Sequence, residues 1–150
     1  MRALFAAILL AASTLAVAKD PVIDRAWIRE APPGAPAHAG FMSIEGGSRD
    51  IEIVGARSDD FGRVEIHEML EENGMMKMRP LERLEVAAGA RVTLAPGAEH
   101  LMLFDAKRPL AAGDKVTITF ELAKGDPVAV EFAVAKAAPA KGDEHAHHGH

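Results

Sequence analysis

The sequence predicts an all-β protein whose strands form a Greek-key sandwich or barrel. Three observations favour this class: polar and apolar residues alternate with a period of two, turn residues recur about every ten positions, and helical periodicity never lasts beyond about two turns. We expect about nine strands. The chain has 150 residues, 49% of them hydrophobic, so it can form one globular domain with its own core.

The N-terminal segment has the pattern of a signal peptide. Arg2 is followed by an apolar run from Ala3 to Val17, and Ala16-Val17-Ala18 has the A-x-A form of a cleavage site. A membrane anchor is the alternative, but a spanning helix needs about 20 apolar residues and this run is shorter. We therefore expect residues 1–18 to be removed after Ala18, leaving a periplasmic protein without stable membrane insertion.

The strands are expected within residues 19–135. Val22 to Arg29 comes first, and Pro32-Pro33-Gly34 ends it because proline cannot donate to a sheet ladder. The next strands are expected at Phe41 to Glu45, Ile51 to Ala56, Arg63 to Leu70 and Met75 to Arg79. Asn73-Gly74 supplies the positive φ angles that a tight hairpin turn needs.

The second half continues the same pattern until the C-terminal tail. Its strands are expected at Leu81 to Val86, Arg91 to Ala95, His100 to Phe104, Lys115 to Leu122 and Val128 to Val134. Beyond Ala135 the alternation is lost among Ala, Lys, Pro and Gly residues. We expect residues 136–150 to form a disordered, His-rich tail.

Charge and cysteine content exclude several functions. The formal net charge is −5, and removing residues 1–18, which contain Arg2 and no acidic residue, makes it one unit more negative. This balance argues against nucleic acid or an anionic membrane as a partner. The chain has no cysteine, which excludes a thiol nucleophile, a CxxC redox pair, a Cys-based zinc site and a blue-copper centre.

Methionine and histidine gather in one region. Apart from Met1 the chain has six methionines, and five of them lie within residues 67–102, the segment that begins with His67 and also contains His100. Methionine most often fills irregular gaps in a core. However, His100 and Met102 project from one side of their strand, and the leucines that alternate with them project from the other. His67 likewise lies opposite its apolar neighbours, so these histidines avoid the expected core faces.

This ligand set favours copper. Thioether sulfur is a soft ligand that suits Cu(I), for which imidazole is also a good partner. In an oxidising compartment, thiolates are prone to oxidation, so a His and Met set without Cys agrees with export. Met76 and Met78 lie just across the Asn73-Gly74 turn from the His67 strand, so local folding can bring imidazole and thioether together.

The spacing of four of these residues is that of a known signature. His67, Met78, His100 and Met102 fit H-x10-M-x21-H-x-M, which resembles the periplasmic copper chaperones of the PCuAC family. The resemblance spans roughly Ala26 to Val134 and includes further matching segments: Trp27, Pro32-Pro33-Gly34, Val64-Glu65-Ile66-His67, Gly74-Met75-Met76-Lys77-Met78-Arg79, Pro96-Gly97 and His100-Leu101-Met102-Leu103. It implies a cupredoxin-like fold that binds one Cu(I) through these two His and two Met.

Other methionines and histidines have separate expectations. Family members often have Met directly after the first His, but here that position is Glu68 and the methionine is Met69, so its part in metal binding stays open and a packing or surface role is favoured. We expect Met75 and Met76 to be hydrophobic rim residues rather than ligands. His38, beside the Pro-rich loop, is expected to be a solvated loop residue.

The His-rich tail suggests a second metal site. Mobile imidazoles prefer Cu(II), Zn²⁺ or Ni²⁺ to a thioether-bound Cu(I), so we expect the tail to collect Cu(II). An expression tag is the alternative, but the run is interrupted and preceded by acidic residues. The tail histidines are His145, His147, His148 and His150.

The resemblance implies a monomeric copper chaperone rather than an enzyme. Its recipient would be the dinuclear copper site in subunit II of cytochrome c oxidase, or a thioredoxin-like assembly factor. A sequestration or resistance protein without a dedicated recipient needs the same ligands and stays open. An electron-transfer cupredoxin needs the missing Cys, a copper enzyme needs an open coordination position, and a purely structural β-domain would make the methionine pattern a coincidence.

Overall fold

A computed structural model describes residues 18–139, and this part of the chain consists of strands and loops without a helix. Ten strands follow one another: β1 (Val22–Arg29), β2 (Ala37–Glu45), β3 (Ile51–Arg57), β4 (Phe61–Glu72), β5 (Met75–Pro80), β6 (Leu84–Val86), β7 (Arg91–Leu94), β8 (His100–Ala106), β9 (Lys115–Leu122) and β10 (Val128–Ala135). The predicted all-β class is confirmed. The predicted signal peptide, apart from Ala18, and the tail histidines lie outside the described residues.

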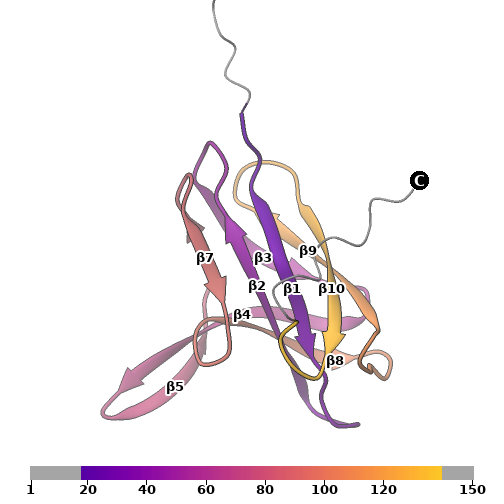
Figure 1. Cartoon of the computed structure of the whole chain (residues 1–150). Coiled ribbons are helices and arrows are strands. Elements are labelled where there is room, and N and C mark those ends of the chain that lie inside the picture. The colour runs from indigo at the N-terminus through magenta and orange to yellow at the C-terminus, as the bar shows by residue number, and fades with distance from the viewer. Residues whose placement is uncertain (1–17, 140–150) are drawn as a thin grey trace, which may run out of the picture.

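Seven strands close into a barrel, with three more attached to it (Figure 1). The order β4-β8-β2-β1-β10-β9-β3 is closed by a pairing of β3 with β4, at Ala56 and Val64. β5, β6 and β7 pair with β4, β3 and β2 respectively. β1 and β10 run parallel, and the remaining pairs are antiparallel. This is the cupredoxin-like architecture that the signature implies.

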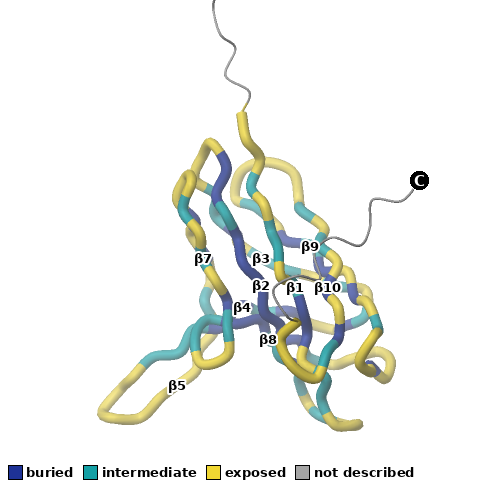
Figure 2. Tube along the Cα trace, in the orientation of Figure 1, coloured by how far each residue is buried: buried dark blue, intermediate teal, exposed yellow. Residues whose placement is uncertain are grey.

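The core is built from the apolar members of the alternating strands. Leu101 and Leu103 of β8 are fully buried, as their phase on the strand predicts, and Phe120 and Phe132 pack across β9 and β10 with ring centroids 6.2 Å apart. The buried positions follow the barrel strands in Figure 2. Within the described residues, no helix has the length and apolar character needed to cross a membrane.

β2 begins earlier than the sequence predicts. The expected strand started at Phe41, but Ala37 already pairs with Phe104 and Ala39 with Met102. Small residues dominate this segment, so its sequence carries little alternation for a pattern to detect. The longer β2 places His38 within the sheet.

The β4–β5 hairpin extends away from the barrel (Figure 1). Asn73 and Gly74 have φ angles of 55° and 76°, the left-handed pair that a type I′ turn requires. All six residues of β5 are exposed (Figure 2), and in the strand order β5 is an end strand that pairs with β4. The hairpin therefore carries methionines into solvent at the edge of the sheet.

Candidate metal centre

The predicted ligands come from three adjacent strands, β5, β4 and β8. His67 lies on β4, Met78 on β5, and His100 and Met102 on β8. In the register His67 faces His100 directly. Because cross-strand partners point to the same face of a sheet, one face carries both imidazoles, and Met102 lies two residues further along β8 on that face. We call this the ligand face.

Two of the predicted ligands are in contact. The Nε2 atom of His100 lies 3.1 Å from the Sδ atom of Met78. The rings of His67 and His100 have centroids 6.2 Å apart. Met102 pairs with Glu65 across the β4–β8 ladder and is half-buried. The structure thus brings a thioether and two imidazoles together, although they are separated by up to 33 positions in the chain.

The imidazoles and the hairpin thioether differ in exposure. His67 is 7% exposed and His100 is 9% exposed, whereas Met78 is 47% exposed. The histidines are held against the barrel, so their positions are set before any ligand arrives. The thioether stands at the open side, where an incoming group can reach it.

His100 has a defined proton arrangement. Its Nδ1 atom lies 2.9 Å from the backbone oxygen of Ala98. A carbonyl oxygen can only accept, so Nδ1 carries the proton and donates. The lone pair is then on Nε2, the atom that faces the Met78 sulfur. This is the usual way in which a protein orients an imidazole to bind a metal.

His67 is held by a carboxylate instead. Its Nε2 atom lies 2.8 Å from Oε2 of Glu65, and Arg63 lies 3.1 Å from the other carboxylate oxygen. The carboxylate accepts the Nε2 hydrogen, which leaves the lone pair on Nδ1. That Nδ1 atom is buried without a hydrogen-bond partner. An unpaired buried nitrogen of this kind fits a metal-binding role, because a metal ion would satisfy it.

The supporting groups extend beyond the predicted ligands. The guanidinium of Arg63 lies 4.3 Å from the ring centroid of Phe104 on β8. Sequence reasoning did not single out Glu65 or Arg63 for a role. The alternation of β4 could have indicated Glu65, since it lies two residues before His67 on the same face.

The prediction for His38 is wrong. His38 is 7% exposed, pairs with Leu103 on the core face, and directs its ring edge-on toward Phe61 with centroids 5.6 Å apart. It is buried because β2 extends back to Ala37. His38 therefore lies on the opposite face of the sheet from Met102, which pairs with Ala39.

The other methionines of the hairpin divide between its two faces. Met69 pairs with Met78 and Met76 pairs with Glu71, so both lie on the ligand face. Met75 pairs with Glu72 on the opposite face. Met75 and Met76 are 61% and 58% exposed, which agrees with the rim position expected for them.

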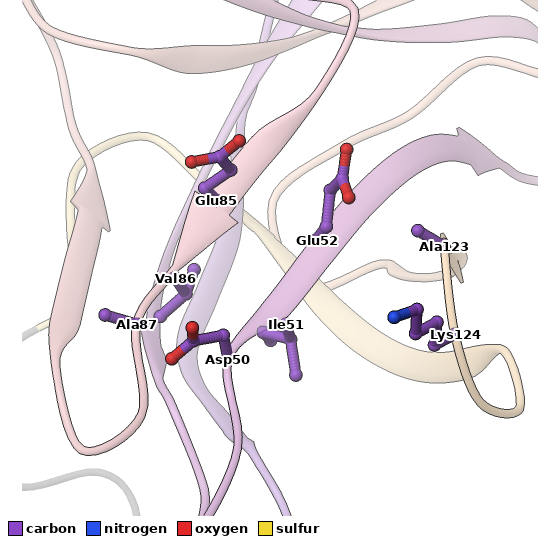
Figure 3. Close-up of a pocket in the computed structure, with 8 residues that line it drawn as sticks. All are labelled: Asp50, Ile51, Glu52, Glu85, Val86, Ala87, Ala123 and Lys124. Atoms are coloured by element: carbon purple, nitrogen blue, oxygen red, sulfur yellow. The ribbon is translucent and has the colours of Figure 1, made fainter.

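A separate hollow lies away from these residues (Figure 3). It is lined by residues of β3 and β6 with the loops that flank them, and by the β9–β10 connection; among these residues are Asp50, Glu52, Glu85 and Lys124. Two of its carboxylates are already engaged: Glu52 with Arg83, and Asp50 with the backbone N–H of Ala88 at 2.8 Å. The hollow therefore offers no set of unpaired ligands comparable with the ligand face.

Comparison with known sequences places the chain in a family. The profile of the LpqE-like family, described as "Putative lipoprotein LpqE-like", matches residues 22–134. The protein named "Putative lipoprotein Lxx21020" from Leifsonia xyli subsp. xyli is 34% identical over 98 residues, which cover 65% of this chain and 58% of that protein. The chain thus spans little more than half the length of this curated relative.

Comparison with solved structures identifies the fold. The apo PCuAC domain from PmoF1 superposes with a TM-score of 0.66 at 20% identity, covering 81% of this chain and 98% of that domain. The Cu(I) form of DR1885 from Deinococcus radiodurans gives a TM-score of 0.57 at 24% identity, covering 84% and 83% of the two chains. The chain belongs to the LpqE-like family and has the fold of the PCuAC domains.

Proposed function

We propose that this protein is a copper chaperone that binds Cu(I) through His67, Met78, His100 and Met102 and passes it to a recipient protein. The observation that carries the proposal is the 3.1 Å approach of the Met78 sulfur to the His100 Nε2 lone pair. Beside it lies His67, whose Nδ1 is buried and unpaired. Two imidazoles and thioethers form a soft donor set that favours Cu(I) over Zn²⁺, Mg²⁺ or Ca²⁺. The Cu(I) form of DR1885 supports the choice of metal and of its oxidation state.

Transfer follows from the unequal exposure of the ligands. Met78 is half-exposed on the hairpin, whereas both histidines are buried. An incoming thiolate or imidazole can displace the Met78 thioether first, while the imidazoles still hold the ion. Copper remains Cu(I) throughout, so the step is ligand exchange and needs neither an oxidant nor a catalytic base.

The recipient belongs to the proposal as well. The signature points to the dinuclear copper site in subunit II of cytochrome c oxidase, or to a thioredoxin-like assembly factor. An incoming thiolate would be a stronger Cu(I) ligand than the thioether that it replaces, which would make transfer favourable. Sequestration without a dedicated recipient is the second candidate, since it uses the same four ligands.

The location and the tail complete the proposal. Export with cleavage after Ala18 places the protein in the periplasm, and the lipoprotein name of the Leifsonia xyli relative supports export. The tail histidines His145, His147, His148 and His150 would collect Cu(II), in addition to the Cu(I) that the folded site binds. Replacing these four by alanine should reduce Cu(II) uptake and leave Cu(I) uptake unchanged, and unaltered Cu(II) uptake would remove the tail from the proposal.

A transfer assay distinguishes a copper chaperone from a protein that only sequesters copper. The Cu(I)-loaded protein is mixed anaerobically with the copper-free soluble domain of oxidase subunit II, and the copper content of each is measured after separation. A chaperone should transfer copper faster than the copper dissociates into a chelator present at the same concentration. Transfer no faster than dissociation would favour sequestration.

A further inference from the structure

We propose that the β4–β5 hairpin holds a second Cu(I) position, formed by the thioethers of Met69, Met76 and Met78, through which copper enters and leaves the main site. We call it the hairpin site. The proposal rests on the copper function proposed above and concerns the path that the ion takes. Its basis is the register of the hairpin, the exposure of its methionines and the sharing of Met78.

The register gathers three sulfurs on one face. Met69 faces Met78 directly across the β4–β5 ladder, and directly opposed residues have Cβ atoms about 4.5–5.5 Å apart. Met76 lies two residues before Met78 on β5, so its side chain leaves the same face about 7 Å away along the strand. Each methionine side chain has three rotatable bonds, so the sulfurs can converge on one ion between them.

Their exposure argues against a packing role. Met76 is 58% exposed and Met78 is 47% exposed, and neither belongs to the buried core. Methionine is ordinarily among the more buried residue types. Apolar side chains held in solvent on an end strand gain little stability from packing, so the sulfurs of Met76 and Met78 are accessible to an incoming ion; the face on which they lie, and not their exposure alone, distinguishes them from Met75.

The hairpin site and the main site share one ligand. The Met78 sulfur lies against His100 Nε2, and it also faces Met69 across the hairpin. An ion held by the three thioethers can therefore keep its bond to Met78 while the bonds to Met69 and Met76 are replaced by bonds to the two imidazoles. No bond to solvent is needed in between, and the oxidation state does not change.

Charge on the hairpin agrees with this path. Glu71 faces Met76 on the ligand face, and its carboxylate favours the approach of a cation to the tip. On the opposite face, the carboxylates are paired with basic residues: Glu68 with Arg79, and Glu72 with Lys77. A cation is therefore attracted more strongly to the face of the hairpin that carries the three sulfurs than to the opposite face.

Met75 provides a matched control. It is the neighbour of Met76 on the same strand and is equally exposed, at 61% against 58%. It faces Glu72 on the opposite side of the hairpin and cannot join the cluster. Met75→Leu and Met76→Leu therefore change the same atoms at the same exposure and differ in the face they alter.

The test compares rates of Cu(I) exchange. The full chain is mixed anaerobically with a chromophoric Cu(I) chelator complex, and uptake and release are followed by stopped-flow absorbance for the wild type, Met75→Leu and Met76→Leu. The hairpin site predicts that Met76→Leu slows both directions several-fold with little change in equilibrium affinity. Met75→Leu should behave as the wild type. Equal rates for Met75→Leu and Met76→Leu would overturn the proposal.

A direct readout distinguishes this proposal from the copper function itself. In a chain labelled at the methionine methyl carbons, the Met69 and Met76 signals should shift when Cu(I) is added to His100→Ala, while Met75 stays in place. Unmoved Met69 and Met76 signals would refute the hairpin site alone. If the wild type instead shows no shift at Met78 or Met102 with Cu(I), the main site fails and the hairpin site fails with it.

Discussion

At the residue scale, the two histidines are held by different means. His100 donates its Nδ1 hydrogen to the Ala98 carbonyl, whereas His67 donates its Nε2 hydrogen to Glu65. Each arrangement leaves one nitrogen with a lone pair that is free to bind a metal ion. On the proposed copper function, Glu65 is thus a positioning residue, because it would act on copper through His67.

Replacing Glu65 by alanine should weaken Cu(I) binding about 10- to 100-fold, as is usual when the partner of a metal-bound imidazole is lost. Competition with a Cu(I) chelator measures the effect. Glu68→Ala is the control, since Glu68 lies on the opposite face and pairs with Arg79 at 2.7 Å. If both substitutions cost the same affinity, the role assigned to Glu65 is incorrect.

At the element scale, β5 positions Met78 without contributing to the core, although its partner β4 is a barrel strand. The residues of β5 are all exposed, and the hairpin turn depends on two residues with positive φ angles. Disturbing this turn should therefore affect the metal site more than the fold.

The substitution Gly74→Ala tests whether the hairpin turn affects copper binding more than it affects the stability of the fold. Gly74 has a φ of 76°, and a side chain in this region costs roughly 1–2 kcal/mol. The strain should fray β5, move Met78 away from His100 and lower Cu(I) affinity, while the thermal unfolding midpoint changes little. Gly125→Ala, with a φ of 103° in the β9–β10 turn, should leave copper binding unchanged. Intact affinity in Gly74→Ala would contradict the account of the hairpin.

Local pattern predicted most strands, but not all of their limits. β1 and β9 have the bounds expected from the sequence. In β9 the apolar residues face the core at every second position. In β1 the adjacent residues Trp27 and Ile28 are both buried, and the register shifts between Asp24 and Trp27. β2 and His38 were misjudged because Ala and Gly residues hide the alternation. The parallel pairing of β1 with β10 and the register that places His67 opposite His100 depend on contacts between distant segments, which no local pattern contains.

At the scale of the whole molecule, β8 joins the core to the candidate site. Leu101 and Leu103 are fully buried inside the barrel, while His100 and Met102 leave β8 on the opposite face. The proposed ligands His100 and Met102 are therefore fixed by a strand whose other side is packed in the core. Stability and metal binding can be altered separately on the same strand.

Leu101→Ala should destabilise the protein by about 2–5 kcal/mol, because it removes buried methyl groups and leaves a cavity. Denaturant unfolding of the metal-free protein measures the loss. Below the unfolding transition, the variant should still bind Cu(I) with nearly the affinity of the wild type. A loss of affinity without a loss of stability would contradict the separation of the two faces.

Exposed ion pairs between residues of β1, β2 and β7 make the stability of the fold depend on pH. Hydrogen bonds from Lys19 and Arg91 lower the pKa of Glu45 below its ordinary value of 4.5, and Arg91 also pairs with Asp24. A lowered pKa in the folded state means that the stabilisation is present above the ordinary pKa and is lost as the pH falls through the folded value.

Glu45→Gln should therefore reduce the unfolding free energy slightly at pH 7, and the difference from the wild type should vanish at strongly acidic pH. Urea unfolding across this pH range measures it. The effect is small because solvent screens exposed pairs. If the difference in unfolding free energy between Glu45→Gln and the wild type grows toward acidic pH, the pKa of Glu45 is not lowered by folding, and the stabilising role assigned to its ion pairs is wrong.

The most direct test of the account is Cu(I) binding by the full chain in competition with a chelator strong enough to exclude weak sites. The wild type should bind a single equivalent of Cu(I) tightly. Met78→Ala and His100→Ala should each weaken this binding at least about tenfold, because even the loss of a residue that only orients a ligand costs about that much affinity. Met75→Ala, on the other face of the hairpin, should bind as the wild type does. If Met78→Ala and His100→Ala retain wild-type affinity, or the wild type does not bind, the ligand face is not a copper site.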